Sequence, residues 1–337
     1  MASITRAEIG RQLKKNTDVM VAAAILGIVL LIIIPLPPLA LDLFLTISIT
    51  ISLLIMLITM FTTEPLQFSV FPSLLLITTL YRLSLNISST RLILGQAQAG
   101  KIINAFGQFV VGGNYIVGAI VFIIITVIQF VVITSGSGRV SEVGARFTLD
   151  AMPGKQMSID AEFNSGLINE EEARDRRRKL QREADFFGAM DGASKFVRGD
   201  AVAGIVICVI NIIGGITIGV LQKGMGMAES LQTYTILTIG DGLVSQIPAV
   251  LISTASGILI TRATTDASFG TDLTRQFLNF PKILFIVAGI LMIIGLIPAM
   301  PGFVFFILAG CSGFLGYSLI KEQKQKIILN GLILLMV

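Results

Sequence analysis

Residues 139–160 read RVSEVGARFTLDAMPGKQMSID, a polar stretch in the middle of a 337-residue chain that is otherwise mostly apolar. Arg139, Glu142 and Arg146 are spaced i, i+3 and i+7, which predicts one helical face with charges of alternating sign. Pro153 and Gly154 are predicted to end that helix in a turn, because proline lacks an N–H donor and glycine accepts turn geometry. The simplest interpretation is a solvated helix-turn-helix linker. As a candidate functional set, called the signature residues, we take Arg139, Glu142, Arg146, Asp150, Pro153, Gly154, Lys155, Gln156 and Asp160, the last as the predicted cap of a second helix.

The composition is that of a membrane protein. Apolar residues make up 54% of the chain and charged residues only 14%, against about 25% charged residues in a typical soluble domain. There is no histidine, and Cys208 and Cys311 lie in separate apolar runs, which argues against a zinc site, a histidine-based triad or a disulfide framework. The chain contains no phosphate-binding loop, dinucleotide-binding glycine motif or hydrolase motif. We therefore expect no cofactor, no bound metal, no nucleic-acid partner and no enzymatic activity.

Apolar runs of about 20 residues are long enough to cross a bilayer as helices. They predict an all-α polytopic membrane protein with about eight transmembrane helices, four at 19–133 and four at 200–320. A helical loop at 134–199 separates the two groups, and polar segments at 1–18 and 321–337 flank them, the second as the start of a linker. The predicted spans are 19–36, 39–62, 71–94, 112–133, 200–221, 234–261, 283–300 and 302–320.

The basic residues predict the orientation. If the N-terminus is cytoplasmic, 21 of the 25 lysines and arginines lie on the cytoplasmic side, Lys101 and Lys223 lie outside, and Arg82 and Arg91 lie within the third span. The opposite orientation would violate the positive-inside rule. We therefore expect both termini and the 134–199 loop to be cytoplasmic. The charged run 170–185 predicts a helix with i, i+4 ion pairs, whose basic residues could also contact anionic lipid headgroups of the bilayer.

Several predicted spans contain polar features. Arg82 and Arg91 of the third span are costly at membrane depth, about 2.5 to 3.5 kcal/mol each. Either Arg91 reaches the interface and Arg82 pairs with a helix terminus, or both face a polar seam. In the sixth span, glycines and Pro248 around Asp241 predict a broken helix. Outside the spans, residues 95–113 are expected to form an amphipathic surface helix, and residues 262–282 a polar loop.

Ionisable residues at membrane depth are candidates for an ion pathway. The sharper hypothesis makes Asp200 and Asp241 proton-accepting carboxylates with Arg91 and Lys195 as their counter-charges, and leaves Arg82 and Arg198 as secondary candidates. The alternatives are structural: Asp200 could be the N-cap of the fifth span, and Asp241 could form a salt bridge with Arg82 or Arg91.

Residues 139–160 resemble the signature of the FHIPEP family, the flagellar and virulence type III export-gate proteins. Other blocks that resemble the family extend the similarity over roughly residues 15–320, and GGNYIVG at 112–118 resembles flagellar members most. These blocks are TTLYRLSLNISSTR (78–91), EADFFGAMDGASKFVRGDAVAGI (183–205), NIIGGITIGVLQ (211–222) and TIGDGLVSQIPAVLISTASG (238–257).

The resemblance implies a homo-oligomeric ring, thought to contain nine subunits, around other type III export-gate subunits at the basal-body ring. Members of the family are implicated in using the proton motive force, or another cation gradient, to export unfolded flagellar proteins. Arg91, Lys195, Asp200 and Asp241 match the charged positions implicated in ion conduction. The family also carries a soluble C-terminal cytoplasmic domain that receives export substrates and chaperones, and this chain ends where the linker to that domain is expected.

Other function classes stay open from the sequence alone. An injectisome export gate of the same family has the same features. A self-contained secondary transporter would show two matching halves with paired broken helices, whereas only the Asp241 region is a strong candidate for one. A structural membrane scaffold is the third class, and neutralising the carboxylates would leave its function intact.

Overall fold

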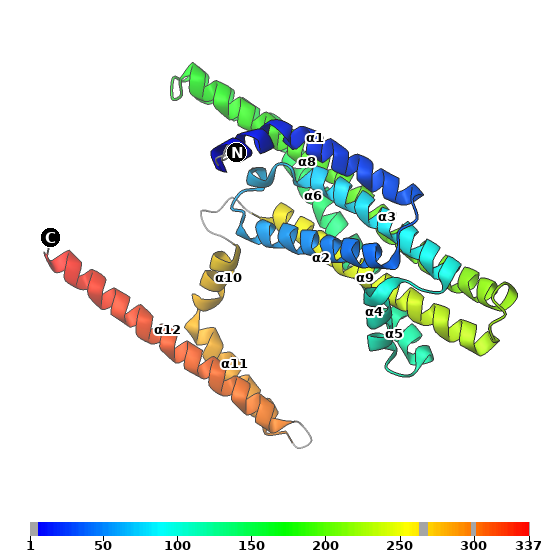
Figure 1. Ribbon diagram of the computed structural model, residues 1–337. Helices are drawn as coiled ribbons and strands as arrows, with labels where there is room; N and C mark the ends of the chain where they lie inside the picture. The colour runs from blue at the N-terminus through cyan, green and yellow to red at the C-terminus, as the bar shows by residue number, and fades with distance from the viewer. Residues whose placement is uncertain (1–5, 263–268, 298–300, 337) are drawn as a thin grey trace. The chain divides into compact units, whose positions relative to one another are not determined.

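The computed structural model describes residues 6–262, 269–297 and 301–336. Within these ranges the regular structure is entirely helical, which confirms the predicted class (Figure 1). The chain divides into two compact units, Met1–Thr265 and Asp266–Val337.

Helix boundaries in the first unit follow local signals in the sequence. Pro37 and Pro38 separate the first two helices, and the Asn114 and Asn169 side chains cap α5 and α8 by accepting backbone N–H bonds. The elements are α1 Arg6–Ile33, α2 Pro38–Phe61, the 3₁₀ turn η1 Pro65–Phe68, α3 Phe71–Gln96, α4 Gly100–Val111, α5 Tyr115–Ile128, the π-helix η2 Gln129–Thr134, α6 Ser135–Asp150, α7 Met152–Asn164, α8 Glu170–Leu221 and α9 Met227–Thr261.

The second unit contains α10 Phe269–Leu278, α11 Pro281–Gly295 and α12 Gly302–Met336. The helices α11 and α12 pack against each other, and Ser312 donates a hydrogen bond to the Leu284 carbonyl at 3.2 Å. The predicted polar loop at 262–282 instead contains α10, while its residues 263–268 lie outside the described part of the chain. The helix α12 continues from the predicted eighth span into the predicted linker.

The predicted number of eight spans is not reproduced. In the part of the chain that the structure describes, five helical runs are long and apolar enough to cross a membrane, and the bent pair formed by α10 and α11 would make a sixth. The apolar part of α1, Asp18–Ile33, is shorter than a full span. The helix α3 is not among the five, because Arg82, Asn86, Arg91 and several hydroxyl residues lower its hydropathy.

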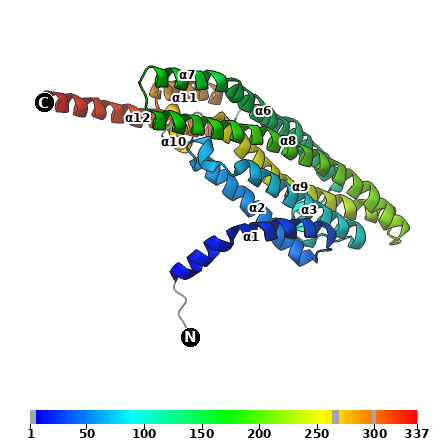
Figure 2. The ribbon, with the colours of Figure 1, turned by 90° about the horizontal axis from the view of Figure 1, so that it is seen from above.

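The predicted loop at 134–199 is a direct continuation of its neighbouring helices. The π-helix η2 joins α5 to α6, and α8 runs without interruption from the charged run at 170–185 to Leu221. Figure 2 shows α6 and α7 alongside α8. Most of the predicted loop is therefore a pair of helical arms that extend from the bundle.

The turn predicted inside residues 139–160 is displaced. The break between α6 and α7 falls at Ala151, and Pro153 occupies the first turn of α7, where a missing N–H costs nothing. Gly154, Lys155 and Gln156 therefore lie within α7 and do not follow a turn. The prediction that Asp160 caps a second helix is also wrong, because Asp160 lies inside α7.

The helix α9 is continuous and lies at the centre of the first unit, packed against α2, α4, α6 and α8 (Figure 1). The broken helix predicted around Asp241 is thus a wrong prediction. The glycines there permit close packing: a Cβ atom at Gly240 would lie 1.9 Å from the Ile103 carbonyl oxygen of α4, and one at Gly107 would lie 2.3 Å from the Ile236 carbonyl oxygen. Pro248 is accommodated inside the helix.

Three apolar clusters form the core of the first unit, and the smallest consists of Val111, Phe122 and Ile239. Another includes Phe71 and Leu75 of α3 with Ile252 and Leu259 of α9. The third includes Leu85 and Leu92 of α3 with Tyr234 and Val244 of α9. Among these apolar residues, α3 and α9 also bury polar side chains, including Arg82, Asn86 and Asp241, which belong to the candidate site.

Candidate functional site

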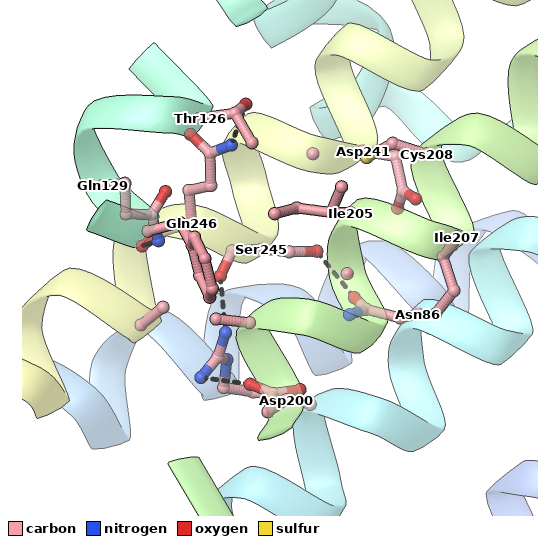
Figure 3. Close-up of a pocket in the computed structure, with 16 residues that line it drawn as sticks. Asn86, Thr126, Gln129, Asp200, Ile205, Ile207, Cys208, Asp241, Ser245 and Gln246 are labelled. Atoms are coloured by element: carbon pink, nitrogen blue, oxygen red, sulfur yellow. Dashed lines mark hydrogen bonds and ion pairs between the residues drawn. The ribbon is translucent and has the colours of Figure 1, made fainter. Parts of the chain in front are cut away.

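A polar cavity of about 50 Å³ lies inside the first unit (Figure 3). A cavity of this volume can hold a few water molecules. Its polar and ionisable lining comes from five elements: Arg82 and Asn86 of α3, Thr126 of α5, Gln129 of η2, Asp200 and Cys208 of α8, and Asp241, Ser245 and Gln246 of α9.

Arg82 and Asp200 form a buried ion pair at one side of the cavity. Arg82 Nη1 lies 2.8 Å from Asp200 Oδ2, and Arg82 Nη2 donates to the Ser245 carbonyl at 3.1 Å. Ser245 Oγ in turn donates to Asn86 Oδ1 at 2.6 Å (Figure 3). Arg82 therefore faces a polar seam between α3, α8 and α9. Asp200 lies in the interior of α8, so it is not an N-cap.

Asp241 lies in the same cavity without a cationic partner in the described part of the chain. It is 3% exposed, and Asn211 of α8 donates to its Oδ2 at 3.5 Å. A salt bridge to Arg82 or Arg91 was one alternative for Asp241, and the structure contradicts it, because Arg82 pairs with Asp200. With both carboxylates ionised, Arg82, Asp200 and Asp241 give the cavity a charge of −1.

Several buried polar atoms around the cavity have no hydrogen-bond partner among the described residues. The acceptors among them include Asp200 Oδ1, Asn211 Oδ1 and Gln246 Oε1. Buried polar atoms in folded proteins nearly always have a partner, either protein or water. The unpaired acceptors therefore indicate a site for a polar occupant such as water or a hydrated ion.

The amide side chains of Gln246 and Gln129 form another wall of the cavity. Gln246 Nε2 donates to Thr126 Oγ1 at 2.7 Å, and Gln129 Nε2 donates to the Gln246 carbonyl at 3.4 Å. Gln129 begins the π-helix η2, and π-helical segments are rare and often occur at functional sites. These contacts connect α5 and η2 to α9 at the level of the two carboxylates.

The predicted counter-charges Arg91 and Lys195 lie elsewhere. Arg91 donates to the Ile33 and Ile32 carbonyls at 2.9 and 3.2 Å, where α1 ends. Lys195 Nζ lies 2.7 Å from Asp191 Oδ2, and its side chain is 58% exposed. This prediction is wrong for a geometric reason. Arg91 is about 14 Å further along α3 than Arg82, and Lys195 lies on a different face of α8 from Asp200.

The remaining candidates do not line the cavity. Arg198 packs its guanidinium against Gly138 of α6, where a Cβ atom would lie 2.7 Å from Arg198 Nη2. Arg139, Glu142, Arg146 and Asp150 are exposed along one side of α6, next to the side that buries Gly138, Ser141 and Ala145, which confirms the predicted polar face. On α7, Lys155 Nζ pairs with Glu183 of α8 at 3.0 Å, Asp160 pairs with Arg177, and Pro153, Gly154 and Gln156 are exposed.

Sequence reasoning missed the uncharged part of the site. The polar residues that complete the cavity interrupt apolar runs and were visible for that reason, but their spacing did not reveal that they converge. They are Asn86, Thr126, Gln129, Asn211, Ser245 and Gln246. Among the described residues no group of three or more cysteine, aspartate or glutamate side chains is close enough to hold a metal ion.

The chain is similar to known proteins over most of its length. The sequence profile of the FHIPEP family matches residues 28–330. The chain is 54% identical over 309 residues to the flagellar biosynthesis protein FlhA of Bacillus subtilis, covering 92% of this chain and 46% of that protein. It is 52% identical over 306 residues to FlhA of Escherichia coli, covering 89% of this chain and 44% of that protein.

A relative with a different name is almost as similar. The low calcium response locus protein D of Yersinia pestis is 51% identical over 313 residues, covering 92% of this chain and 44% of that protein. The chain thus spans somewhat less than half the length of these relatives. No solved structure matches the chain significantly. A family profile that matches residues 28–330 and relatives above 50% identity identify this multi-pass membrane protein as a member of the FHIPEP family.

Proposed function

We propose that this chain is the membrane region of a flagellar type III export gate and that its polar cavity carries the ion flow that drives export of unfolded flagellar proteins. One observation carries the proposal. Asp241, a buried carboxylate without a cationic partner in the described structure, shares an intramembrane cavity with the Arg82–Asp200 ion pair. Ionisable residues at membrane depth are functional-site candidates by default, and many of them belong to ion or proton pathways.

The charge balance of the cavity supports uptake of one proton or one other monovalent cation. Arg82 compensates Asp200, so the charge of −1 resides at Asp241. When Asp241 binds a proton or a monovalent cation, the net charge of the cavity becomes zero. The arginine keeps Asp200 fixed between α3 and α8, while the unpaired oxygens of Asn211 and Gln246 can accept bonds from a hydrated ion. In this proposal Asp241 is the acceptor, Asp200 a second carboxylate on the path, and Arg82 the positioning cation.

The proposal extends to the assembly, membrane orientation and partners of the chain, for which family membership is the support. The chain forms a ring of about nine copies, which encloses other export-gate subunits at the basal body of a bacterial inner membrane. Both termini and the arms formed by α6, α7 and the charged part of α8 are cytoplasmic. Export substrates and chaperones bind the full-length protein outside these residues. Because the flagellar and low-calcium-response relatives are similarly close, an injectisome gate is the second candidate.

A proton-flux assay tests the proposal. The purified chain is reconstituted into liposomes that contain a pH-sensitive dye, and a pH gradient is imposed with valinomycin and potassium to clamp the potential. We expect flux from the unaltered chain that is lost in Asp241→Asn and reduced in Asp200→Asn. Glu170→Gln, an exposed change near the start of α8, serves as the matched control. Equal flux, or equal absence of flux, in all four proteins would favour the scaffold function.

A further inference from the structure

A charged groove lies on the surface of the first unit, between α8 and the connection from α2 to α3. Its volume is about 900 Å³. Three acidic and three basic side chains line it, so its formal charge is zero. They are Glu64, Asp175 and Asp185 against Arg178, Lys179 and Arg182. We call this the headgroup groove.

An apolar furrow adjoins the headgroup groove. Leu54, Leu57, Ile58 and Phe61 of the last turns of α2 line this furrow, which has a volume of about 410 Å³. Their side chains are exposed, from 42% for Leu57 to 73% for Phe61. Gln67 lines both the furrow and the headgroup groove. The two hollows are therefore neighbours, one apolar and one charged.

The position of this pair of hollows corresponds to the edge of a membrane. The helix α2 is a 24-residue apolar helix that ends at Phe61, and the polar residues Thr62, Thr63 and Glu64 follow at once. The length of α2 matches the hydrocarbon thickness of a bilayer. The furrow lies along the apolar end of the helix, and the headgroup groove lies just beyond it, where lipid headgroups lie.

The basic residues of α8 differ in whether they form ion pairs with acidic residues. Arg174, Arg176 and Arg177 are bound to acidic residues of α7 and α8 outside the groove. In the groove, Lys179 Nζ lies 3.4 Å from Glu64 Oε2, and Arg178 Nη1 lies 3.9 Å from Asp175 Oδ1. Arg182 is exposed and has no ion pair among the described residues. The groove therefore offers one uncommitted cation beside a set of carboxylates, which is not the strongly basic surface that an anionic lipid favours.

We propose that the two hollows together bind a zwitterionic phospholipid with a primary amine in its headgroup, of the phosphatidylethanolamine type. Its phosphate contacts Arg182 and Arg178, and its ammonium group donates to Asp185 and Glu64, which matches the zero net charge of the groove. One acyl chain lies along Leu54, Leu57 and Phe61. Such a lipid would hold the α2–α3 connection against the charged part of α8.

Native mass spectrometry of the purified chain tests this site. The protein is equilibrated with an equimolar mixture of phosphatidylethanolamine, phosphatidylcholine and phosphatidylglycerol that carry identical acyl chains, and the retained lipids are counted. Phosphatidylcholine has no N–H to donate, so we expect phosphatidylethanolamine to be retained over it by about fivefold, the worth of one partly exposed charged contact. Preferred retention of phosphatidylglycerol, or equal retention of all three, would overturn the proposal.

Substitutions in the headgroup groove and in the apolar furrow test whether the lipid binds at these two hollows. Asp185→Asn is expected to abolish the preference for phosphatidylethanolamine over phosphatidylcholine, and Arg182→Gln to reduce the retention of both about fivefold. Arg174→Gln, an exposed change on the same helix outside the groove, is the matched control. Leu57→Ser should lower retention whatever the headgroup, whereas Leu43→Ser, an exposed change elsewhere on α2, should not. Far-ultraviolet circular dichroism verifies that each variant is folded, and unchanged selectivity in folded Asp185→Asn would contradict the assignment.

Discussion

Arg82 Nη1 and Asp200 Oδ2 are 2.8 Å apart, and the two side chains are only 6% and 1% exposed. The pair joins α3 to α8 inside the helical bundle, and Arg82 lies about one turn of α3 before Leu85 of the apolar cluster. Two charges withdrawn from water are costly unless they stay together. Each partner therefore constrains where the other can move, and α3 and α8 are coupled at this point.

Removal of one member of the pair should be worse than removal of both. Arg82→Met or Asp200→Leu alone leaves an uncompensated buried charge, so each is expected to lower the free energy of unfolding by about 3 to 5 kcal/mol. The double variant should lose less than either single variant, because no unpaired charge remains buried. Denaturant titration of the detergent-solubilised proteins, followed by circular dichroism, measures all three values. Strict additivity would mean that the two charges do not stabilise each other.

Gly240 should be irreplaceable because of the backbone that it faces. Even alanine there would place a Cβ atom 1.9 Å from the Ile103 carbonyl oxygen, so α4 and α9 must separate. We expect Gly240→Ala to destabilise the protein by about 1 to 3 kcal/mol, as overpacking does in other cores. Gly188→Ala is the matched control, because no atom lies within 4 Å of its Cβ position. It should be neutral or stabilising by up to about 1 kcal/mol through helix propensity. Thermal melts of both variants distinguish the two cases.

The apolar runs predicted the helices well, because each long run in the first unit coincides with a helix and the prolines at 35–38 separate two of them. They did not predict where a helix continues. Nothing in the polar sequence at 134–138 or 185–199 shows that α5 extends into α6 or that α8 runs unbroken. Helix continuity across such residues is decided by tertiary contacts, such as Ser141 against Ser256 at 3.1 Å.

The candidate site was predicted in part. Asp200 and Asp241 were recognised because carboxylates are rare in apolar runs, and the structure places both in one cavity. Their partners depend on the rotation of α3 and α8 about their axes, which one sequence does not specify. The glycines beside Asp241 were taken as breaks in α9, whereas they permit contact with α4 and Phe122. Glycine can either break a helix or allow a second helix to pack closely against it. Which of the two occurs depends on the neighbouring helix, and one sequence does not show that helix.

Gln246 should be needed for ion flux although it carries no charge. Its amide bonds to Thr126 Oγ1 at 2.7 Å and leaves Oε1 without a partner among the described residues. Gln246→Leu would make this wall apolar and is expected to reduce proton flux about tenfold or more, because water would lose one of the few hydrogen-bonding groups there. Gln108→Leu, an exposed change on α4, should leave the flux unchanged. Equal fluxes in the liposome assay would remove Gln246 from the pathway.

The arm α7 should detach without unfolding the bundle. No residue of α7 is buried, so its contacts with α8 rest largely on Lys155–Glu183, Arg176–Glu162 and Arg177–Asp160. Exposed pairs of this kind contribute about 0.2 to 1 kcal/mol each and are screened by salt. We expect Asp160→Asn to speed amide hydrogen exchange in Met152–Asn164, and a rise from low to 0.5 M salt to do the same in the unaltered chain, with exchange in α9 unchanged. Glu170→Gln is the matched control, because its pair with Arg174 lies within α8 and its loss leaves α7 attached. If exchange in α7 were insensitive to both changes, then apolar contacts, and not these ion pairs, would hold the arm against α8.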